Sequence, residues 1–314
     1  MPEQIAIRTR ELSRSFKGKV AVEDLNLKIK TGEIFGLVGP DGSGKTTTIR
    51  LLTAIMDPSE GEASVAGFDT VRQPEQIKRR IGYMAQRFNL YRDLSVLENL
   101  NFYADVFEVS GAERAERIDR LLRFARLGEF KDRRAAYLSG GMQKKLALAC
   151  TLIHTPEIIF LDEPTTGVDP VSRREFWDIL TSLHLQGITL VISTPYMDEA
   201  ERCSRIGLLH AGRMLLCATP DEIKQKVSGE IVAIWPSDLF RARELLENLD
   251  SVIQVQTYGR QLRLVTRDSA KTAAEARQIL EENDIRILDI RHTQPRMEEA
   301  FISLIGQAVE ETSQ

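Results

Sequence analysis

A glycine-rich stretch near the N-terminus has the residue types and spacing of a site for nucleotide phosphates. It matches the pattern G-x-x-x-x-G-K-[ST] and lies between an expected buried strand at 33–38 and an expected helix from Lys45 to about Ile55. Glycines let backbone N–H groups close around phosphate oxygens, Lys45 would add a positive charge, and Thr46 would offer its hydroxyl to Mg²⁺. The alternative is a plain glycine-rich turn. The residues predicted to bind the nucleotide here are Gly39, Pro40, Asp41, Gly42, Ser43, Gly44, Lys45, Thr46 and Thr47.

Two adjacent carboxylates follow a second apolar run, at 158–161. In parallel sheets, ligands bind at the carboxyl ends of the strands, which is where Asp162 and Glu163 would lie. Asp162 could hold Mg²⁺ through a water, and Glu163 could orient and polarise a water that attacks the γ-phosphate. Glu163 is therefore the candidate catalytic residue. The alternative is that Asp162 caps the next segment and that Glu163 is merely exposed.

A third candidate site lies at a predicted helix start. Ser139 is a good N-cap, and Gly140 and Gly141 leave backbone N–H groups open to an anion. Because the chain already has a phosphate site of its own, this second site would serve another nucleotide. It predicts a head-to-tail pair of chains, in which Ser139, Gly140 and Gly141 of one chain face the γ-phosphate held by the other. The alternative is an ordinary capped helix.

The elements that must position these residues predict an α/β fold with two domains. Residues 1–228 would form a nucleotide-binding domain with antiparallel strands at 5–29, a parallel sheet of alternating strands and helices, and a helical insertion at about 88–150. Residues 229–314 would form a smaller domain. Its expected order is β-α-β-β-α-β, which is the ferredoxin-like order, followed by a terminal helix at 297–305.

Composition narrows the classes of function. The chain has 314 residues, enough for about two domains, and its net charge of −4 gives no basic field, so we expect no nucleic-acid partner. It has no apolar run of the roughly 18–20 residues that a membrane span needs, and its first residues do not look like a signal peptide. The three cysteines show no C-x-x-C spacing, which favours reduced thiols and no zinc. We therefore expect a cytoplasmic chain that reaches a membrane only through a partner.

Taken together and in order, these motifs resemble those of ATP-binding cassette (ABC) transporter ATPases. The resemblance covers about residues 5–225 and rests on segments 39–47, 138–143, 158–164 and 167–170 and on Gln86. It implies a P-loop ATPase core that binds ATP and Mg²⁺ and works as a nucleotide-sandwich dimer.

The same resemblance implies roles for three further residues. Gln86 would be the Q-loop glutamine that touches Mg²⁺ and relays to the membrane subunit, and Asp169 would be the D-loop aspartate at the dimer seam. Phe16 would stack on adenine; its alternative is a core phenylalanine of the first strands. Phe88, Leu90 and Tyr91 lie where the family receives a permease helix, with local packing of the helical insertion as the alternative.

Two departures from the family pattern matter for function. Met142 replaces the usual glutamine of the signature, which leaves the backbone donors in place. Pro195 replaces the histidine of the switch region, and because proline donates no hydrogen bond, the γ-phosphate contact from this position is lost and the hydrolysis rate is in doubt. These features and the C-terminal extension resemble drug-export cassettes, whose permeases are separate chains.

The sequence therefore predicts the ATP-binding subunit of an ABC exporter, at the cytoplasmic face of the cell membrane. Its expected partners are integral-membrane permease subunits and a second ATP-binding subunit, either a copy of itself or the other half of an asymmetric pair. One alternative is a hydrolysis-deficient regulatory or partner cassette. Another is a soluble ABC ATPase without a transport role, which would need a long coiled-coil insertion or a second cassette; the sequence has no second G-x-x-x-x-G-K-[ST] motif.

Overall fold

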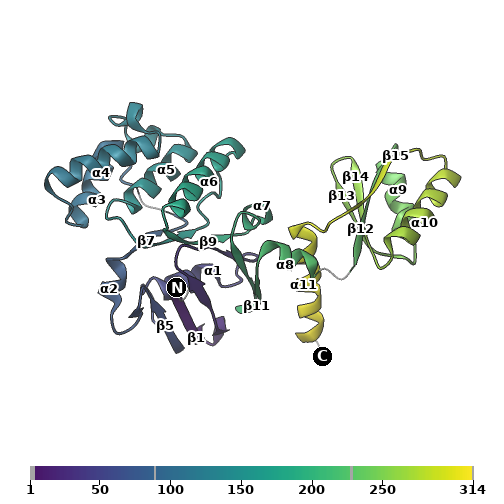
Figure 1. Cartoon of the computed structure of the whole chain (residues 1–314), viewed down its shortest axis with the longest axis horizontal. Helices are drawn as coiled ribbons and strands as arrows, with labels where there is room; N and C mark the ends of the chain where they lie inside the picture. Colours follow the sequence, from purple (N-terminus) through teal and green to yellow (C-terminus); the bar gives the residue numbers. More distant parts are fainter. Residues whose placement is uncertain (1–3, 88–89, 227–228, 313–314) are drawn as a thin grey trace. The chain divides into compact units, whose positions relative to one another are not determined.

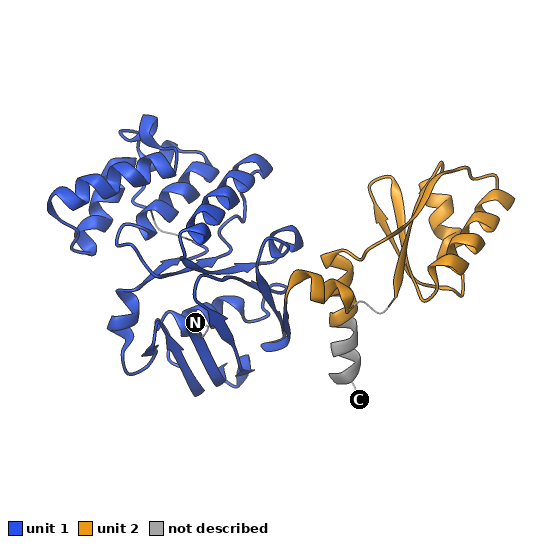
Figure 2. Cartoon of the chain, viewed as in Figure 1, with its two compact units in different colours: residues 1–218 blue, residues 219–314 orange. Residues whose placement is uncertain are grey.

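The computed structural model describes residues 4–87, 90–226 and 229–312. The chain divides into two compact units, residues 1–218 and 219–314 (Figure 2). The division falls before the predicted boundary at 228/229 because helix α8 (Pro220–Gln225) contacts helix α11 (Met297–Thr312), an element of the second unit. Among the described residues, no helix is both long and apolar enough to cross a membrane.

The first unit begins with a five-stranded antiparallel sheet. Its strands are β1 (Ile5–Phe16), β2 (Lys19–Leu25), β3 (Lys28–Lys30), β5 (Glu60–Val65) and β6 (Phe68–Asp69). The order is β2-β1-β5-β6, and β3 also pairs with β1. Lys17 and Gly18 link β1 to β2 with φ values of 46° and 82°, which suits a tight hairpin turn. The antiparallel strands predicted at 5–29 are confirmed.

A six-stranded sheet forms the centre of the first unit, in the order β11-β10-β4-β9-β8-β7. Its strands are β4 (Ile34–Val38), β7 (Ile81–Met84), β8 (Ile158–Asp162), β9 (Thr189–Thr194), β10 (Arg205–His210) and β11 (Arg213–Ala218). All neighbours pair in parallel except β10 and β11. Strands β4, β8 and β9 are buried along their whole length, as expected for strands covered on both faces. Their carboxyl ends therefore meet at one edge of the sheet.

Helices surround this sheet and make up the insertion (Figure 1). The helices of the core are α1 (Lys45–Leu52), α2 (Pro74–Lys78), α6 (Pro170–Leu185) and α7 (Met197–Ala200). The segment predicted as a helical insertion holds α3 (Val96–Val106), α4 (Gly111–Phe124), α5 (Gly140–Thr151) and the 3₁₀ turns Gly128–Phe130 and Ala135–Tyr137. Helix α6 begins at Pro170 because Asp169 is its N-cap and proline suits the first turn of a helix.

The second unit contains a four-stranded antiparallel sheet in the order β13-β14-β12-β15. Its elements are β12 (Glu230–Pro236), α9 (Leu239–Leu246), β13 (Val252–Tyr258), β14 (Gln261–Thr266), α10 (Ser269–Glu282) and β15 (Ile287–Thr293). This is the predicted β-α-β-β-α-β order. Arg263 of β14 is buried and pairs with Glu299 of α11, which gives the buried charge the partner it requires.

Candidate active site

The loop between β4 and α1 brings backbone groups close together because glycine occupies its tight positions. A Cβ atom on Gly44, whose φ is 106°, would lie 2.4 Å from the carbonyl oxygen of Ala21. A Cβ on Gly39 would lie 2.2 Å from the carbonyl oxygen of Leu209. Gly44 caps α1 without a side-chain hydrogen bond, so the first N–H groups of this helix are left for an anion. The loop therefore has the construction of a phosphate cradle.

Lys45 is buried, with an exposed fraction of 4%. Its Nζ donates hydrogen bonds to the carbonyl oxygens of Gly39 (2.8 Å) and Pro40 (3.0 Å), and it lies 3.6 Å from Oε1 of Glu163. These contacts hold the ammonium group inside the loop, between the cradle and the second carboxylate. A cation at this place can act on the phosphates of a bound nucleotide.

The structure brings Asp162 together with Thr46. Thr46 Oγ1 donates to Oδ1 of Asp162 at 3.1 Å, and Ser193 Oγ donates to the same oxygen at 2.6 Å. Asp162 is buried at the end of β8 and binds these two hydroxyls, so the interpretation of Asp162 as a simple cap for the next segment is wrong. The pair supplies hydroxyl and carboxylate oxygens, which are ligands that Mg²⁺ prefers.

These donors fit a magnesium ion that is held mainly by its nucleotide. Within the described ranges, no group of three or more His, Cys, Asp or Glu side chains could hold a metal ion. Mg²⁺ in nucleotide sites needs only one or two protein ligands, because water and phosphate oxygens complete its octahedron. Thr46, Asp162 and the amide of Gln86 are therefore an adequate set for this role.

Glu163 is held by contacts to both of its carboxylate oxygens. Oε2 accepts hydrogen bonds from Nε2 of Gln86 (2.8 Å) and Oγ1 of Thr166 (3.3 Å), while Oε1 faces Lys45. Its backbone N–H donates to Ser193 Oγ at 2.9 Å, and its φ of 47° is unusual for a residue with a side chain. With 8% of its surface exposed, Glu163 is not the merely exposed residue of the alternative interpretation. Residues with an unusual backbone conformation that their surroundings hold in place gather at functional sites.

A cavity of about 650 Å³ brings together nine of the predicted site residues. It is lined by Ala21, Asp41, Gly42, Gly44, Lys45, Thr46, Thr47, Gln86, Glu163, Thr166, Pro195 and Tyr196. Phe16 is not among these residues. Its ring is 40% exposed at the end of β1, with the guanidinium of Arg14 4.8 Å from its centroid, so the core alternative for Phe16 is wrong. Its contact with adenine stays a prediction.

Glu199, which is only 1% exposed, holds the switch segment that contains Pro195 in place. The Glu199 carboxylate accepts hydrogen bonds from Thr165 and from Thr194 (2.7 Å), and lies 3.8 Å from Nε of Arg173. The guanidinium of Arg173 also stacks 4.4 Å from the ring centroid of Tyr196. This network joins the segment after Glu163, the switch and helix α6. The network could not be predicted from the sequence, because nothing in the local pattern marks Glu199 as buried.

The predicted partner-facing residues lie outside the 650 Å³ cavity. Ser139 caps α5, where its Oγ accepts a hydrogen bond from the N–H of Met142 at 3.3 Å. Asp169 caps α6 by accepting from the N–H of Ser172 at 2.9 Å, and that backbone hydrogen bond lowers the pKa of Asp169. Both caps are exposed at helix starts. Their roles toward a second nucleotide and at a dimer seam stay predictions.

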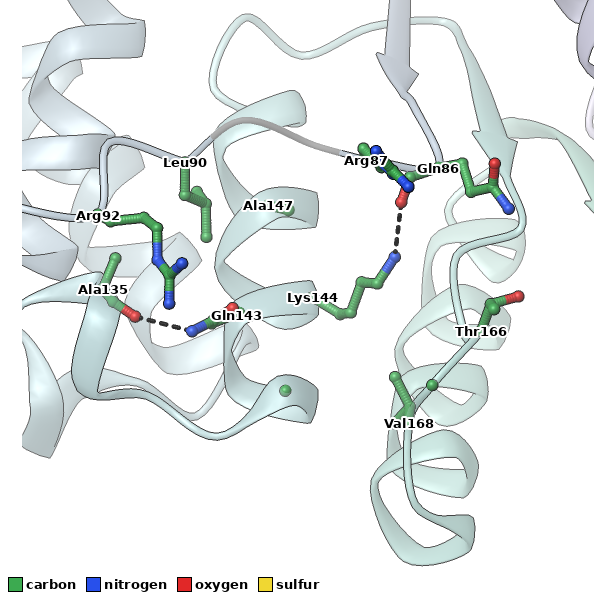
Figure 3. A pocket seen from close by; sticks show the side chains of 12 residues that line it. Gln86, Arg87, Leu90, Arg92, Ala135, Gln143, Lys144, Ala147, Thr166 and Val168 are labelled. Carbon is green, nitrogen blue, oxygen red and sulfur yellow. Dashed lines mark hydrogen bonds between the residues drawn. The ribbon is translucent and has the colours of Figure 1, made fainter.

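A second pocket, of about 350 Å³, lies beside α5 (Figure 3). It is lined by Gln86, Arg87, Leu90, Arg92, Ala135, Gly140, Gln143, Lys144, Ala147, Thr166, Gly167 and Val168. The described lining therefore carries three cationic side chains and no acidic one. Of the three residues expected to meet a permease helix, Leu90 lines this pocket, Tyr91 packs on Phe102 with ring centroids 4.3 Å apart, and Phe88 lies outside the described residues.

Lys144 connects this second pocket to the cavity. Its Nζ donates to the backbone carbonyl oxygen of Gln86 at 3.2 Å, the contact drawn in Figure 3. Partial burial lowers the pKa of Lys144, and the nearby carboxylates of Glu163 and Asp162 act in the opposite direction. The role of Lys144 could not be predicted from local sequence, because its partner lies 58 positions away.

Known proteins resemble the chain along its whole length. A family model described as ABC transporter matches residues 22–166. Nod factor export ATP-binding protein I of Cupriavidus metallidurans is 34% identical over 96% of this chain and 97% of that protein. The chain belongs to the ABC transporter family. Daunorubicin/doxorubicin resistance ATP-binding protein DrrA of Streptomyces peucetius is 32% identical over 98% of this ABC chain and 94% of that protein.

Two further similar proteins match only part of their own length or part of this chain. The "Probable multidrug ABC transporter ATP-binding protein YbhF" of Escherichia coli K12 is 41% identical over 95% of this ABC chain, but the chain spans only about half, 51%, of its length. A dimeric ATP-binding cassette in a post-hydrolysis state bound to ADP and Pi is 30% identical, with a TM-score of 0.63 over 68% of this chain and 98% of the other. The predicted P-loop ATPase core is confirmed.

Proposed function

We propose that this chain is the ATP-binding subunit of an ABC exporter, in which binding and hydrolysis of ATP by a head-to-tail dimer drive export through separate permease subunits. The observation that carries the proposal is the cavity in which the glycine cradle, Lys45, Thr46 and Glu163 meet. Relatives named for Nod factor export and for daunorubicin/doxorubicin resistance support export as the process served.

The residues of the cavity have separate roles in the transfer of the γ-phosphoryl group to water. Backbone N–H groups of the cradle and the ammonium of Lys45 bind the phosphates, which replace the carbonyl partners that Lys45 has in this structure. Thr46, Asp162 and Gln86 would hold Mg²⁺, which neutralises charge that develops on the transferred phosphoryl group. Glu163 accepts a hydrogen bond from the attacking water and orients it toward the γ-phosphate.

The exposed helix start at Ser139 would complete the γ-phosphate site of a second cassette, with Asp169 at the seam between the two. The second pocket is suited to receive a permease segment, because its apolar residues Leu90 and Val168 lie among basic ones. This placement would hold the chain at the cytoplasmic face of the membrane.

A second candidate function is that of a cassette that binds ATP but hydrolyses it slowly, as a regulatory or asymmetric partner. Pro195 favours it, since this residue lines the cavity and cannot donate a hydrogen bond to a γ-phosphate. Measured turnover of the purified chain, alone and with its permease, distinguishes the two functions.

The test of the main proposal compares two substitutions at the cavity. Glu163→Gln keeps the size and the acceptor oxygen of the side chain but removes its negative charge, so we expect ATP to stay bound and the chain to elute as a dimer in gel filtration with Mg-ATP. Lys45→Ala removes the buried cation, so we expect no nucleotide binding in calorimetry and a monomer. Wild-type turnover by Glu163→Gln, or unchanged ATP affinity in Lys45→Ala, would contradict the proposed roles.

A further inference from the structure

We propose that Lys144 is a positioning residue for ATP hydrolysis, which acts through Gln86 to keep the Glu163 carboxylate in place. The inference rests on the proposed function, because it assigns Lys144 a part in the same reaction. It also connects α5, the helix that Ser139 caps, through Gln86 to the catalytic carboxylate of its own chain.

The connection consists of consecutive polar contacts. Lys144 Nζ donates to the backbone carbonyl oxygen of Gln86 at 3.2 Å, as Figure 3 shows. The side chain of the same glutamine donates from Nε2 to Glu163 Oε2 at 2.8 Å. The other carboxylate oxygen of Glu163 lies 3.6 Å from Nζ of Lys45, at the start of α1. Helix α5 is therefore joined to the phosphate cradle through Gln86 and Glu163.

The charge of Lys144 suits this role. A hydrogen bond from an ammonium group is stronger than one from a neutral donor, so the contact to the Gln86 carbonyl fixes the backbone from which the amide reaches Glu163. Partial burial lowers the pKa of Lys144, and the carboxylates of Glu163 and Asp162 oppose that effect in part. Arg87 and Arg92 line the same pocket, but Lys144 is the cation with a contact to Gln86 among those that the structure describes.

Because Lys144 lies on α5, its contact with Gln86 links the start of that helix to the hydrolytic site. Because Ser139, Gly140 and Gly141 begin this helix, an anion that engages them acts on the rigid element that carries Lys144. A shift of α5 would move the Gln86 backbone and change how the amide meets Glu163. In a head-to-tail pair, nucleotide bound by one cassette would thus affect the hydrolytic carboxylate of the other.

The test measures single-turnover and steady-state ATP hydrolysis by the purified chain. Lys144→Met keeps the helix propensity and the apolar stem of the side chain but removes the ammonium group. We expect kcat to fall about tenfold while KM for ATP changes less than about twofold, as for a group that acts on the hydrolytic step rather than on binding. Lys144→Arg should recover at least half of the loss. The matched control is Lys131→Met, at an exposed lysine of the same helical insertion.

A double-mutant cycle separates positioning from a general effect on α5. In the Gln86→Ala background the amide that Lys144 positions is absent, so adding Lys144→Met should change kcat less than about twofold. An equal loss in both backgrounds, or a Lys144→Met enzyme with wild-type kcat, would overturn the inference. A wild-type chain that releases no more phosphate from ATP than Lys45→Ala would instead overturn the proposed function, and with it this inference.

Discussion

Replacing Pro195 by histidine should speed ATP hydrolysis by the purified chain. The position lines the same cavity as Lys45 and Glu163, so a side chain that donates a hydrogen bond there can reach a bound γ-phosphate. The residues on either side of Pro195 have hydrogen bonds of their own. Thr194 is held by Glu199, and the N–H of Tyr196 donates to Thr194 Oγ1 at 3.1 Å. An imidazole would therefore enter a segment whose two ends are already fixed.

The expected gain in kcat can be judged from the cost of losing one hydrogen-bond donor to the γ-phosphate. Removal of a single preorganised donor to developing charge costs about 2.7–4 kcal/mol, which is 10²–10³ in rate. Residue 194 ends strand β9 and is extended already, so the restriction that proline places on the residue before it changes little here. The full factor applies to a donor that is preorganised toward the developing charge, and an imidazole newly introduced at this position meets that condition only in part. We therefore expect kcat to rise between about fivefold and 10²-fold, with little change in ATP affinity.

The assay is Mg-ATP turnover with kcat and KM determined separately, and Pro195→Ala is the control. Alanine restores a backbone N–H but supplies no side-chain donor, so it should leave kcat close to the wild-type value. If the natural protein already turns over fast and Pro195→His is no faster, another group makes the γ-phosphate contact. If Pro195→Ala and Pro195→His gain equally, the backbone rather than the imidazole is responsible.

Two further predictions concern ATP binding by the first unit alone and the reactivity of the three cysteine thiols. A chain cut after Ala218 should fold and bind ATP as the full chain does, because the residues of the cavity lie within the first unit; a truncation that is folded by circular dichroism but has lost ATP affinity in calorimetry would contradict this. Burial raises the pKa of the Cys150 and Cys203 thiols, which keeps them protonated at pH 8, so iodoacetamide should label only the partly exposed Cys217 until the protein unfolds. Mass spectrometry that finds three labels on the folded chain would refute it.

The sequence predicted those parts of the site that depend on local pattern. The cradle at 39–47 could be placed because glycine spacing, a preceding apolar strand and a following helix all occur within about twenty residues. Asp162 and Glu163 could be placed because a strand that is buried on both faces ends at them. The order of elements in the second unit followed from alternating and helical periodicity.

Contacts between segments that are distant in the chain could not be predicted from local sequence patterns. Ser193 binds both the Asp162 side chain and the Glu163 backbone, but this depends on β9 lying next to β8 in the sheet. The Lys144 contact depends on how α5 packs beside the segment that follows β7. The predicted boundary at 228/229 rests on a serine and a glycine, whereas the compact units divide after Ala218 because α8 packs with α11 from the far end of the chain.

The strand order of the central sheet also sets when the protein can first bind its nucleotide during synthesis. The cradle directly follows strand β4. The neighbours of β4 in the sheet, β9 and β10, come much later in the chain: Ile34 pairs with Leu190, more than 150 residues further on. At about 5–20 residues per second, a ribosome needs roughly eight to thirty-five seconds to supply these partners. Until then both edges of an apolar strand are unpaired, which invites aggregation. ATP can therefore stabilise only a nearly finished cassette, and the nascent chain must be protected by other means.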